Sequence, residues 1–225
     1  MPSVTLIATS ATELKGHPTG LWIEELASPY YIFTEAGYDV SIASPSGGAV
    51  PIDAASLGEG FFTEPAKKFM HDGAAFGKLS HTSKVSEVSV ADTDAIFCCG
   101  GHGTCVDFID NADLKSLIEN MLSGGKVVAA VCHGPMCLVD CVKADGVTPL
   151  VKDMAVTGFS DSEEKAVQLD GLVPFLLEAK LKEQGGLYER GDDWSSKVCT
   201  EGKLVTGQNP QSSEACAEAV VSLLA

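Results

Sequence analysis

The feature that most constrains the fold is a run of apolar residues, 127–131, that ends abruptly at Cys132. Five consecutive apolar residues, three of them valine, predict a β-strand that is buried on both faces, as a parallel sheet requires. Gly134 and Pro135 interrupt the strand, and proline suits the first turn of a helix. We therefore expect Cys132 to lie on a sharp turn between a strand and a helix, the geometry of a nucleophile elbow.

A cysteine in that position is expected to be reactive. A helix N-terminus and nearby backbone N–H groups favour the thiolate, so we expect a lowered pKa for Cys132. The alternative is that Cys132 is only a small buried hydrophobe, which is common for cysteine. His133 and Gly134 follow directly, at a strand end where open α/β sheets bind ligands, and this position favours a functional cysteine.

Apolar strand patterns alternate with helix patterns along the whole chain. Strands are expected at residues 4–8, 38–43, 95–99, 127–131, 154–157, 197–200 and 204–206, and helices at residues 21–27, 113–122 and 175–184 and from residue 212 onward. This alternation predicts an α/β fold with a doubly wound, mostly parallel sheet sandwiched by helices. No linker or repeat divides the sequence, so we expect one domain over residues 1–225, with a loop-rich insertion around residues 44–84 that forms a lid or pocket wall.

Charge and the N-terminal sequence exclude several kinds of partner. Asp and Glu outnumber Lys and Arg by 31 to 15, which argues against binding nucleic acid or an anionic membrane through a basic surface. The first residues lead into a short strand without a basic or long apolar leader, and no stretch of about 20 apolar residues occurs. We expect a cytoplasmic protein that binds neither nucleic acid nor a membrane.

The cysteines are expected to be reduced and mostly part of the core. Several of the eight lie in apolar strand or helix patterns: Cys98, Cys99, Cys105, Cys132, Cys137, Cys141, Cys199 and Cys216. No Cys-x-x-Cys or His-x-x-x-His pair is present, so we predict no metal site. A soft-metal site at Cys137 and Cys141, one helical turn apart, is the alternative.

A second candidate segment is the glycine-rich turn at residues 100–104, which follows the strand at residues 95–99. Glycine after a parallel strand permits a positive φ and a close approach of backbone N–H groups to a ligand, although a plain turn needs glycine as well. Phosphate binding is a weak alternative, because neither a Lys-Ser/Thr pair nor the dinucleotide fingerprint is present.

A cysteine nucleophile needs a base, and the chain has five histidines: His17, His71, His81, His102 and His133. None follows His133, which excludes the usual α/β-hydrolase order and the late histidine of true glutamine amidotransferases. The base is therefore His133 or a residue upstream. Acidic residues lie in first turns of expected helices at 24–25 and 161–164, where carboxylates often only complement the helix dipole.

These segments resemble the ThiJ/PfpI superfamily, which has the flavodoxin-like, class I glutamine amidotransferase-like fold. The matching pieces are residues 19–20 with Glu24, and residues 100–104, 129–135, 157–164 and 205–210. They are most similar to the chaperone-type glyoxalase III branch, also catalogued as D-lactate dehydratase. The resemblance implies a homodimeric, cofactor-free lyase of the stress response that converts methylglyoxal, a small 2-oxoaldehyde, into D-lactate without glutathione.

The resemblance also implies catalytic roles. Cys132 is the nucleophile, His133 the histidine, Glu164 the acid that orients it, and Glu24 the carboxyl group beside the thiol. The thiolate would add to the aldehyde, and Glu24 or His133 would move a proton between the two carbons through an enediol. We expect Glu24 to be the shuttle, and to stay protonated near neutral pH because it faces a thiolate.

The oxyanion site implied by the resemblance consists of backbone N–H groups of Gly101 and His133, and the neighbouring substrate-binding positions are Gly100, His102 and Gly134. Glu163 or Asp161 is an alternative to Glu164 as the acid. Alternative functions for the same cysteine are a holdase chaperone, a redox sensor, and a deglycase or hydrolase.

Overall fold

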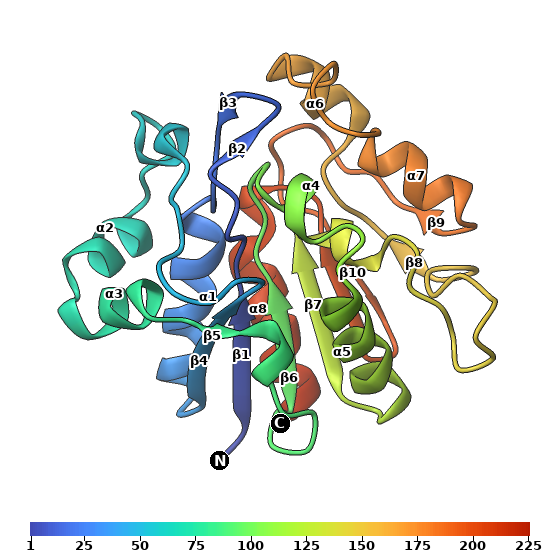
Figure 1. Ribbon diagram of the computed structural model, residues 1–225, viewed down its shortest axis with the longest axis horizontal. Helices are drawn as coiled ribbons and strands as arrows, with labels where there is room; N and C mark the ends of the chain where they lie inside the picture. Colours follow the sequence, from blue (N-terminus) through green and yellow to red (C-terminus); the bar gives the residue numbers. More distant parts are fainter.

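A seven-stranded sheet forms the centre of the protein, in a computed structural model that describes all 225 residues (Figure 1). In spatial order the strands are β10 (Val198–Glu201), β11 (Leu204–Gly207), β7 (Val127–Val131), β6 (Ala95–Cys98), β1 (Ser3–Ile7), β4 (Asp39–Ser44) and β5 (Ser83–Lys84). All neighbours are parallel except the hairpin β10–β11. The predicted α/β fold with a mostly parallel sheet is confirmed.

The middle strands are apolar because both faces of the sheet are covered. All residues of β6 and β7 are buried, as the valine-rich run predicts. The register sets Phe97 between Leu6 of β1 and Ala129 of β7, so its large ring has a small neighbour on one side. Parallel register brings the C-terminal ends of β6 and β7 to the same edge, where the glycine turn and Cys132 follow.

Helices cover both faces of the sheet. Helix α1 (Glu24–Glu35) packs against α8 (Ser213–Leu224) behind the sheet, and α5 (Ala112–Ser123) lies in front of it (Figure 1). Helix α1 continues through Pro29 and ends before Gly37, whose φ is +81°. None of the helices combines the length and the apolar character needed to cross a bilayer.

The smaller elements lie in the connections. Residues 44–84 contain more helix than the sequence predicts, and the remaining elements form short turns and pairs at the edges of the fold. These elements are β2 (Glu13–Leu14), β3 (His17–Pro18), η1 (Ala54–Leu57), α2 (Glu64–His71), α3 (Gly73–Ser80), η2 (Val85–Glu87), α4 (Thr104–Asp107), β8 (Ala155–Val156), α6 (Asp161–Ala166), α7 (Leu177–Glu183), β9 (Leu187–Tyr188) and η4 (Pro210–Ser212). The strand predicted at residues 154–157 forms as β8, but it pairs with β9 outside the main sheet.

The segment after Cys132 differs from the expectation. It is a 3₁₀ helix, η3 (Gly134–Leu138), in place of an α-helix, and all five of its residues are buried. Gly134 lies so close to the end of β6 that a Cβ there would stand 2.2 Å from the carbonyl oxygen of Cys98. A helix this short has only a small dipole, which weakens the argument for a lowered pKa at Cys132.

Candidate active site

Cys132 occupies a strained turn that neighbouring segments hold in place. Its φ is +60°, in the left-handed region that residues other than glycine rarely adopt. Its backbone N–H donates to the carbonyl oxygen of Gly207 at 2.9 Å, and its carbonyl oxygen accepts from the N–H of Phe159 at 2.8 Å. The nucleophile-elbow backbone expected at the end of β7 is present, and these two contacts fix it.

Cys132, His133 and Glu164 form a hydrogen-bonded chain. Sγ of Cys132 lies 3.5 Å from Nδ1 of His133, and Nε2 of His133 lies 2.6 Å from Oε2 of Glu164. Burial opposes ionisation of Glu164, but its contacts with His133 and His102 outweigh burial and hold its pKa well below the usual range. Because a carboxylate accepts from Nε2, that nitrogen carries the proton in neutral His133, and Nδ1 is free to accept one from the thiol.

The two alternatives to Glu164 lie elsewhere. Glu163 is fully buried, and its carboxylate accepts hydrogen bonds from Ser160, Trp194, Gln208 and Asn209. Its oxygens are thereby used to join three loops. Burial, and after it the negative charge of Glu178, raises the pKa of Asp161. Only Glu164 of these three acids contacts His133.

Glu25, and not Glu24, is the carboxyl group beside the thiol. The side chain of Glu25 is fully buried close to the Cys132 thiol. Its Oε2 accepts from the N–H of Gly100 at 2.7 Å, and its Oε1 has no hydrogen-bond partner. Burial is the main reason that its pKa rises to about 8. Glu24 instead accepts a hydrogen bond from the hydroxyl group of Thr63, and burial raises its pKa to about 7. The expectation that Glu24 faces the thiol is therefore wrong.

Helix geometry explains the difference. Successive residues of an α-helix point about 100° apart, so two adjacent glutamates cannot face the same group. Glu25 lies on the same face as Pro29 and Phe33, four and eight residues later, and both are buried. The apolar pattern of this helix was the available sign that Glu25 is the inward-facing residue.

The pKa of Cys132 is raised, contrary to the sequence expectation. Burial is the largest cause, and the nearby carboxyl group of Glu25 adds to it, whereas the N–H of His133 favours the thiolate. The thiol and Glu25 thus both hold their protons near neutral pH. Attack by Cys132 then requires a base at the moment of reaction, and Nδ1 of His133 is in position to act as one.

The expected oxyanion and substrate-binding positions divide into two groups. Gly101 and His102 line a cavity with Cys132 and His133, and the N–H of Gly101 has no acceptor within the protein. Gly101 has a φ of +97°, and a Cβ there would stand 2.2 Å from the carbonyl oxygen of Gly20. Gly100 and Gly134 do not line the cavity. The N–H of Gly100 donates to Glu25, and Gly134 packs against the end of β6.

The cavity has a volume of about 60 Å³ and is mostly apolar. Besides the four residues named above, Trp22, Phe61, Phe159, Val167, Trp194, Pro210 and Gln211 line it. Phe61 comes from the insertion at residues 44–84, which therefore supplies a pocket wall as expected. Trp22 and Trp194 were not among the expected site residues. Trp194 lies in an irregular segment without a periodic pattern, and Trp22 falls within the helix expected at residues 21–27 but precedes α1 in the structure. The volume is small enough to favour a substrate of only a few heavy atoms.

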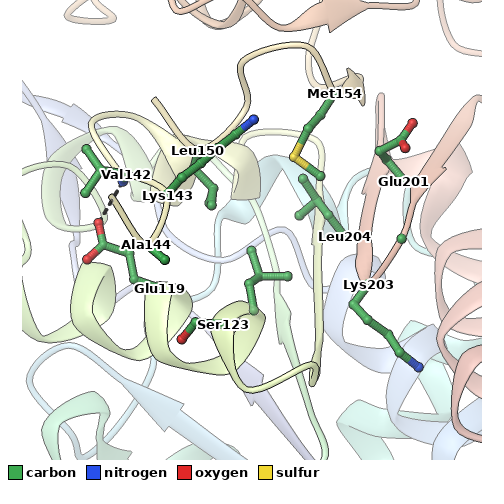
Figure 2. Close-up of a pocket in the computed structure, with 12 residues that line it drawn as sticks. Glu119, Ser123, Val142, Lys143, Ala144, Leu150, Met154, Glu201, Lys203 and Leu204 are labelled. Atoms are coloured by element: carbon green, nitrogen blue, oxygen red, sulfur yellow. Dashed lines mark hydrogen bonds between the residues drawn. The ribbon is translucent and has the colours of Figure 1, made fainter. Parts of the chain in front are cut away.

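A larger hollow of about 440 Å³ lies far from this chemistry (Figure 2). It is bounded by α5, the segment at residues 142–154 and the β10–β11 hairpin, and Figure 2 shows Glu119 accepting a hydrogen bond from the N–H of Val142. Its lining includes neither histidine nor cysteine. We therefore place the candidate active site at the smaller cavity.

The same cluster contains side chains of the types that bind metal ions. The ligand atoms of His102, His133 and Glu164 lie within 4.8 Å of one another. Hydrogen bonds of 2.6 and 2.7 Å from the two Nε2 atoms to the carboxylate account for this closeness. A metal ion would have to displace both bonds. All eight cysteines, including Cys137 and Cys141, are free and buried, and the Cys141 thiol contacts the carbonyl oxygen of Cys137.

Comparison with known proteins gives a consistent result. The sequence model of the DJ-1/PfpI family matches residues 22–223. Glyoxalase 3 of Candida albicans is 29% identical over 99% of this chain and 98% of its own length. Glutathione-independent glyoxalase HSP31 of Saccharomyces cerevisiae is 30% identical over 90% of this chain and 88% of its own.

Solved structures agree with the sequence comparison. The crystal structure of glyoxalase III from Candida albicans superposes with a TM-score of 0.90 at 29% identity and covers 99% of this chain and 97% of that chain. Rapid Encystment Protein 24 KDa of Francisella tularensis superposes with a TM-score of 0.95 at 34% identity, with full coverage of both chains.

Proposed function

Because the chain belongs to the DJ-1/PfpI family, we propose that it is a glutathione-independent glyoxalase that converts methylglyoxal into D-lactate. The observation that carries this proposal is the chain from Cys132 through His133 to Glu164, next to the buried carboxyl group of Glu25, in a cavity of about 60 Å³. Relatives named glyoxalase 3 and glutathione-independent glyoxalase align with 99% and 90% of the chain, respectively.

The first step is addition of the thiol to the aldehyde. Nδ1 of His133, 3.5 Å from Sγ, accepts the thiol proton as the bond between sulfur and the aldehyde carbon forms. The N–H groups of Gly101 and His133 stabilise the oxyanion, and His133 then returns the proton to that oxygen. The product is a hemithioacetal that remains neutral in the apolar cavity.

The second step moves a proton between the two substrate carbons. The ionised form of Glu25 removes the hydrogen from the carbon bound to sulfur, and an enediolate forms. The hydroxyl proton on that carbon passes to the neighbouring oxygen, and Glu25 returns its own proton to the neighbouring carbon. This carboxyl group suits the task because a pKa of about 8 lets it both accept and release a proton near neutral pH. The result is a thioester of lactate on Cys132, which water hydrolyses.

The size of the cavity favours this activity over the alternative of a deglycase. A glycated protein side chain needs an open channel that admits several linked atoms of a polymer. The cavity has a volume of only about 60 Å³, and Trp22, Phe61 and Trp194 are part of its lining. Methylglyoxal has five heavy atoms and no long substituent. The geometry thus supports a free small aldehyde as the substrate.

The test is to incubate the purified protein with methylglyoxal in the absence of glutathione and to assay D-lactate. The Cys132→Ala variant should make none and keep its fold. Cys137→Ala, which removes a buried thiol from the next turn, is the matched control and should retain most of the activity. Full turnover by Cys132→Ala would exclude the assigned nucleophile.

We further propose a cytoplasmic homodimer, which is supported by the resemblance of the sequence to the superfamily. Light scattering at micromolar concentration measures the mass of the particle in solution. A mass of twice 23.4 kDa is the expected result. A clean monomer mass would contradict the dimer.

A further inference from the structure

A second imidazole contacts the same carboxylate as His133. Nε2 of His102 lies 2.7 Å from Oε1 of Glu164, and the rings of His102 and His133 are 4.0 Å apart. Each imidazole therefore bonds a different oxygen of Glu164. The role of His133 follows from its contact with Sγ, but the addition and proton-transfer steps leave His102 without a task.

The second nitrogen of His102 is available to a ligand. Because Nε2 donates to a carboxylate, Nδ1 of the neutral ring carries no proton. Nδ1 makes no hydrogen bond within the protein, and His102 lines the cavity together with Cys132. Burial is the largest cause of a lowered pKa at His102, and the neutral, basic form of the ring is therefore the stable one.

Hydrolysis of the lactate thioester needs a base in this position. Nδ1 of His133 faces the sulfur, which becomes the leaving group. Water reaches the acyl carbon from the cavity, whose lining includes His102, and Nδ1 of that ring is unprotonated and makes no hydrogen bond to the protein. Glu164 therefore holds two imidazoles with different positions: His133 faces the sulfur, and His102 is left for the water.

We propose that His102 is the general base that activates the hydrolytic water, a role that rests on the proposed glyoxalase function. One O–H bond of water breaks as its oxygen bonds to the acyl carbon, and the proton goes to Nδ1 of His102. The bond between carbon and sulfur then breaks, and its electron pair stays on Sγ of Cys132. The proton held by His102 passes by way of cavity water to Nδ1 of His133 and from there to the sulfur, and the other proton of the water leaves with lactic acid.

The test compares His102→Gln with the wild-type enzyme. A glutamine amide reaches the position of Nε2 and still donates to Glu164, but it supplies no base at the position of Nδ1. The variant should react with methylglyoxal at the wild-type rate, while steady formation of D-lactate falls by about 10²-fold or more. Intact-mass spectrometry should show one lactoyl group accumulating on Cys132, and hydroxylamine should release it as the hydroxamate.

A matched control is His81→Gln, which changes an exposed histidine far from the cavity and should behave as wild type. His102→Asn serves as the second variant if the glutamine variant does not fold, and the same acyl accumulation is expected of it. Unchanged turnover overturns the proposal. Equal loss of adduct formation and turnover in a folded variant also overturns it, because His102 then only positions Glu164. A wild-type enzyme that forms neither adduct nor D-lactate refutes the glyoxalase function itself.

Discussion

Glu25→Gln is expected to make the protein more stable at neutral pH. The folded protein keeps Glu25 protonated up to a pKa of about 8, whereas the unfolded chain releases that proton near 4.5. Folding at pH 7 must therefore take up a proton. Each pH unit above 4.5 costs about 1.4 kcal/mol, so the total is about 3 kcal/mol at pH 7.

Glutamine avoids this cost because it is neutral in both states. Its amide oxygen keeps the hydrogen bond from Gly100, and its NH₂ group can donate to the sulfur of Cys132. The gain in unfolding free energy should be largest above pH 8, about 3 kcal/mol at pH 7, and close to zero near pH 4.5. The sign of the effect follows from the raised pKa. Glu25 does not lower the unfolding free energy of the wild-type protein below pH 4.5, and it lowers that free energy progressively as the pH rises toward 8.

The assay is urea unfolding of wild type and variant at pH 5 and pH 7, with thermal melts in parallel. In a domain of this size 1 kcal/mol shifts Tm by about 2–4 °C, so the variant should melt about 6–12 °C higher at pH 7. Glu24→Gln is the control. The pKa of about 7 at Glu24 implies a similar gain at pH 7, but that gain should stop growing above pH 7. The gain of Glu25→Gln grows up to about pH 8, so a third unfolding series at pH 8 separates the two. Equal gains for Glu25→Gln at pH 5 and pH 7 would refute the reasoning.

Three further predictions concern the same site. The rate constant kcat/KM should rise with pH up to about 8, because only ionised Glu25 removes the substrate proton, and a profile that is flat between pH 6 and 8 would argue against that role. Alkylation of Cys132 by iodoacetamide should begin at a higher pH than for a free thiol, and Glu25→Gln should move its onset to lower pH. Gly101→Ala should lose D-lactate formation and lower Tm, because the new Cβ meets the carbonyl oxygen of Gly20; an active variant would show that the turn can shift.

Much of the fold could be predicted from the sequence, because the strongest patterns belong to the buried centre of the sheet. The valine-rich run of β7 and the short apolar runs of β1 and β6 are typical of buried parallel strands, because helix patterns follow each of them. The same runs locate Cys132 at a strand end. The 3₁₀ geometry of η3 could not be predicted, because it results from close packing of Gly134 against the end of β6.

The candidate catalytic cluster was predictable in part. His133 and Glu164 could be matched to a known motif, but the choice between Glu24 and Glu25 depends on the phase of α1 against the sheet. The raised pKa of Cys132 depends on burial, which a sequence motif does not report. The function of Glu163 was hidden for a similar reason, since its hydrogen-bond donors come from residues 160, 194, 208 and 209.

The most direct test is the initial rate of D-lactate formation from methylglyoxal, without glutathione, by wild type, Glu24→Gln, Glu25→Gln and Cys132→Ala. The structure places Glu25 against the thiol and Glu24 against Thr63. Glu24→Gln should therefore stay within a few-fold of wild type. Glu25→Gln and Cys132→Ala should each lose about 10²-fold or more. A Glu25→Gln enzyme as fast as wild type, or a loss confined to Glu24→Gln, would contradict the account.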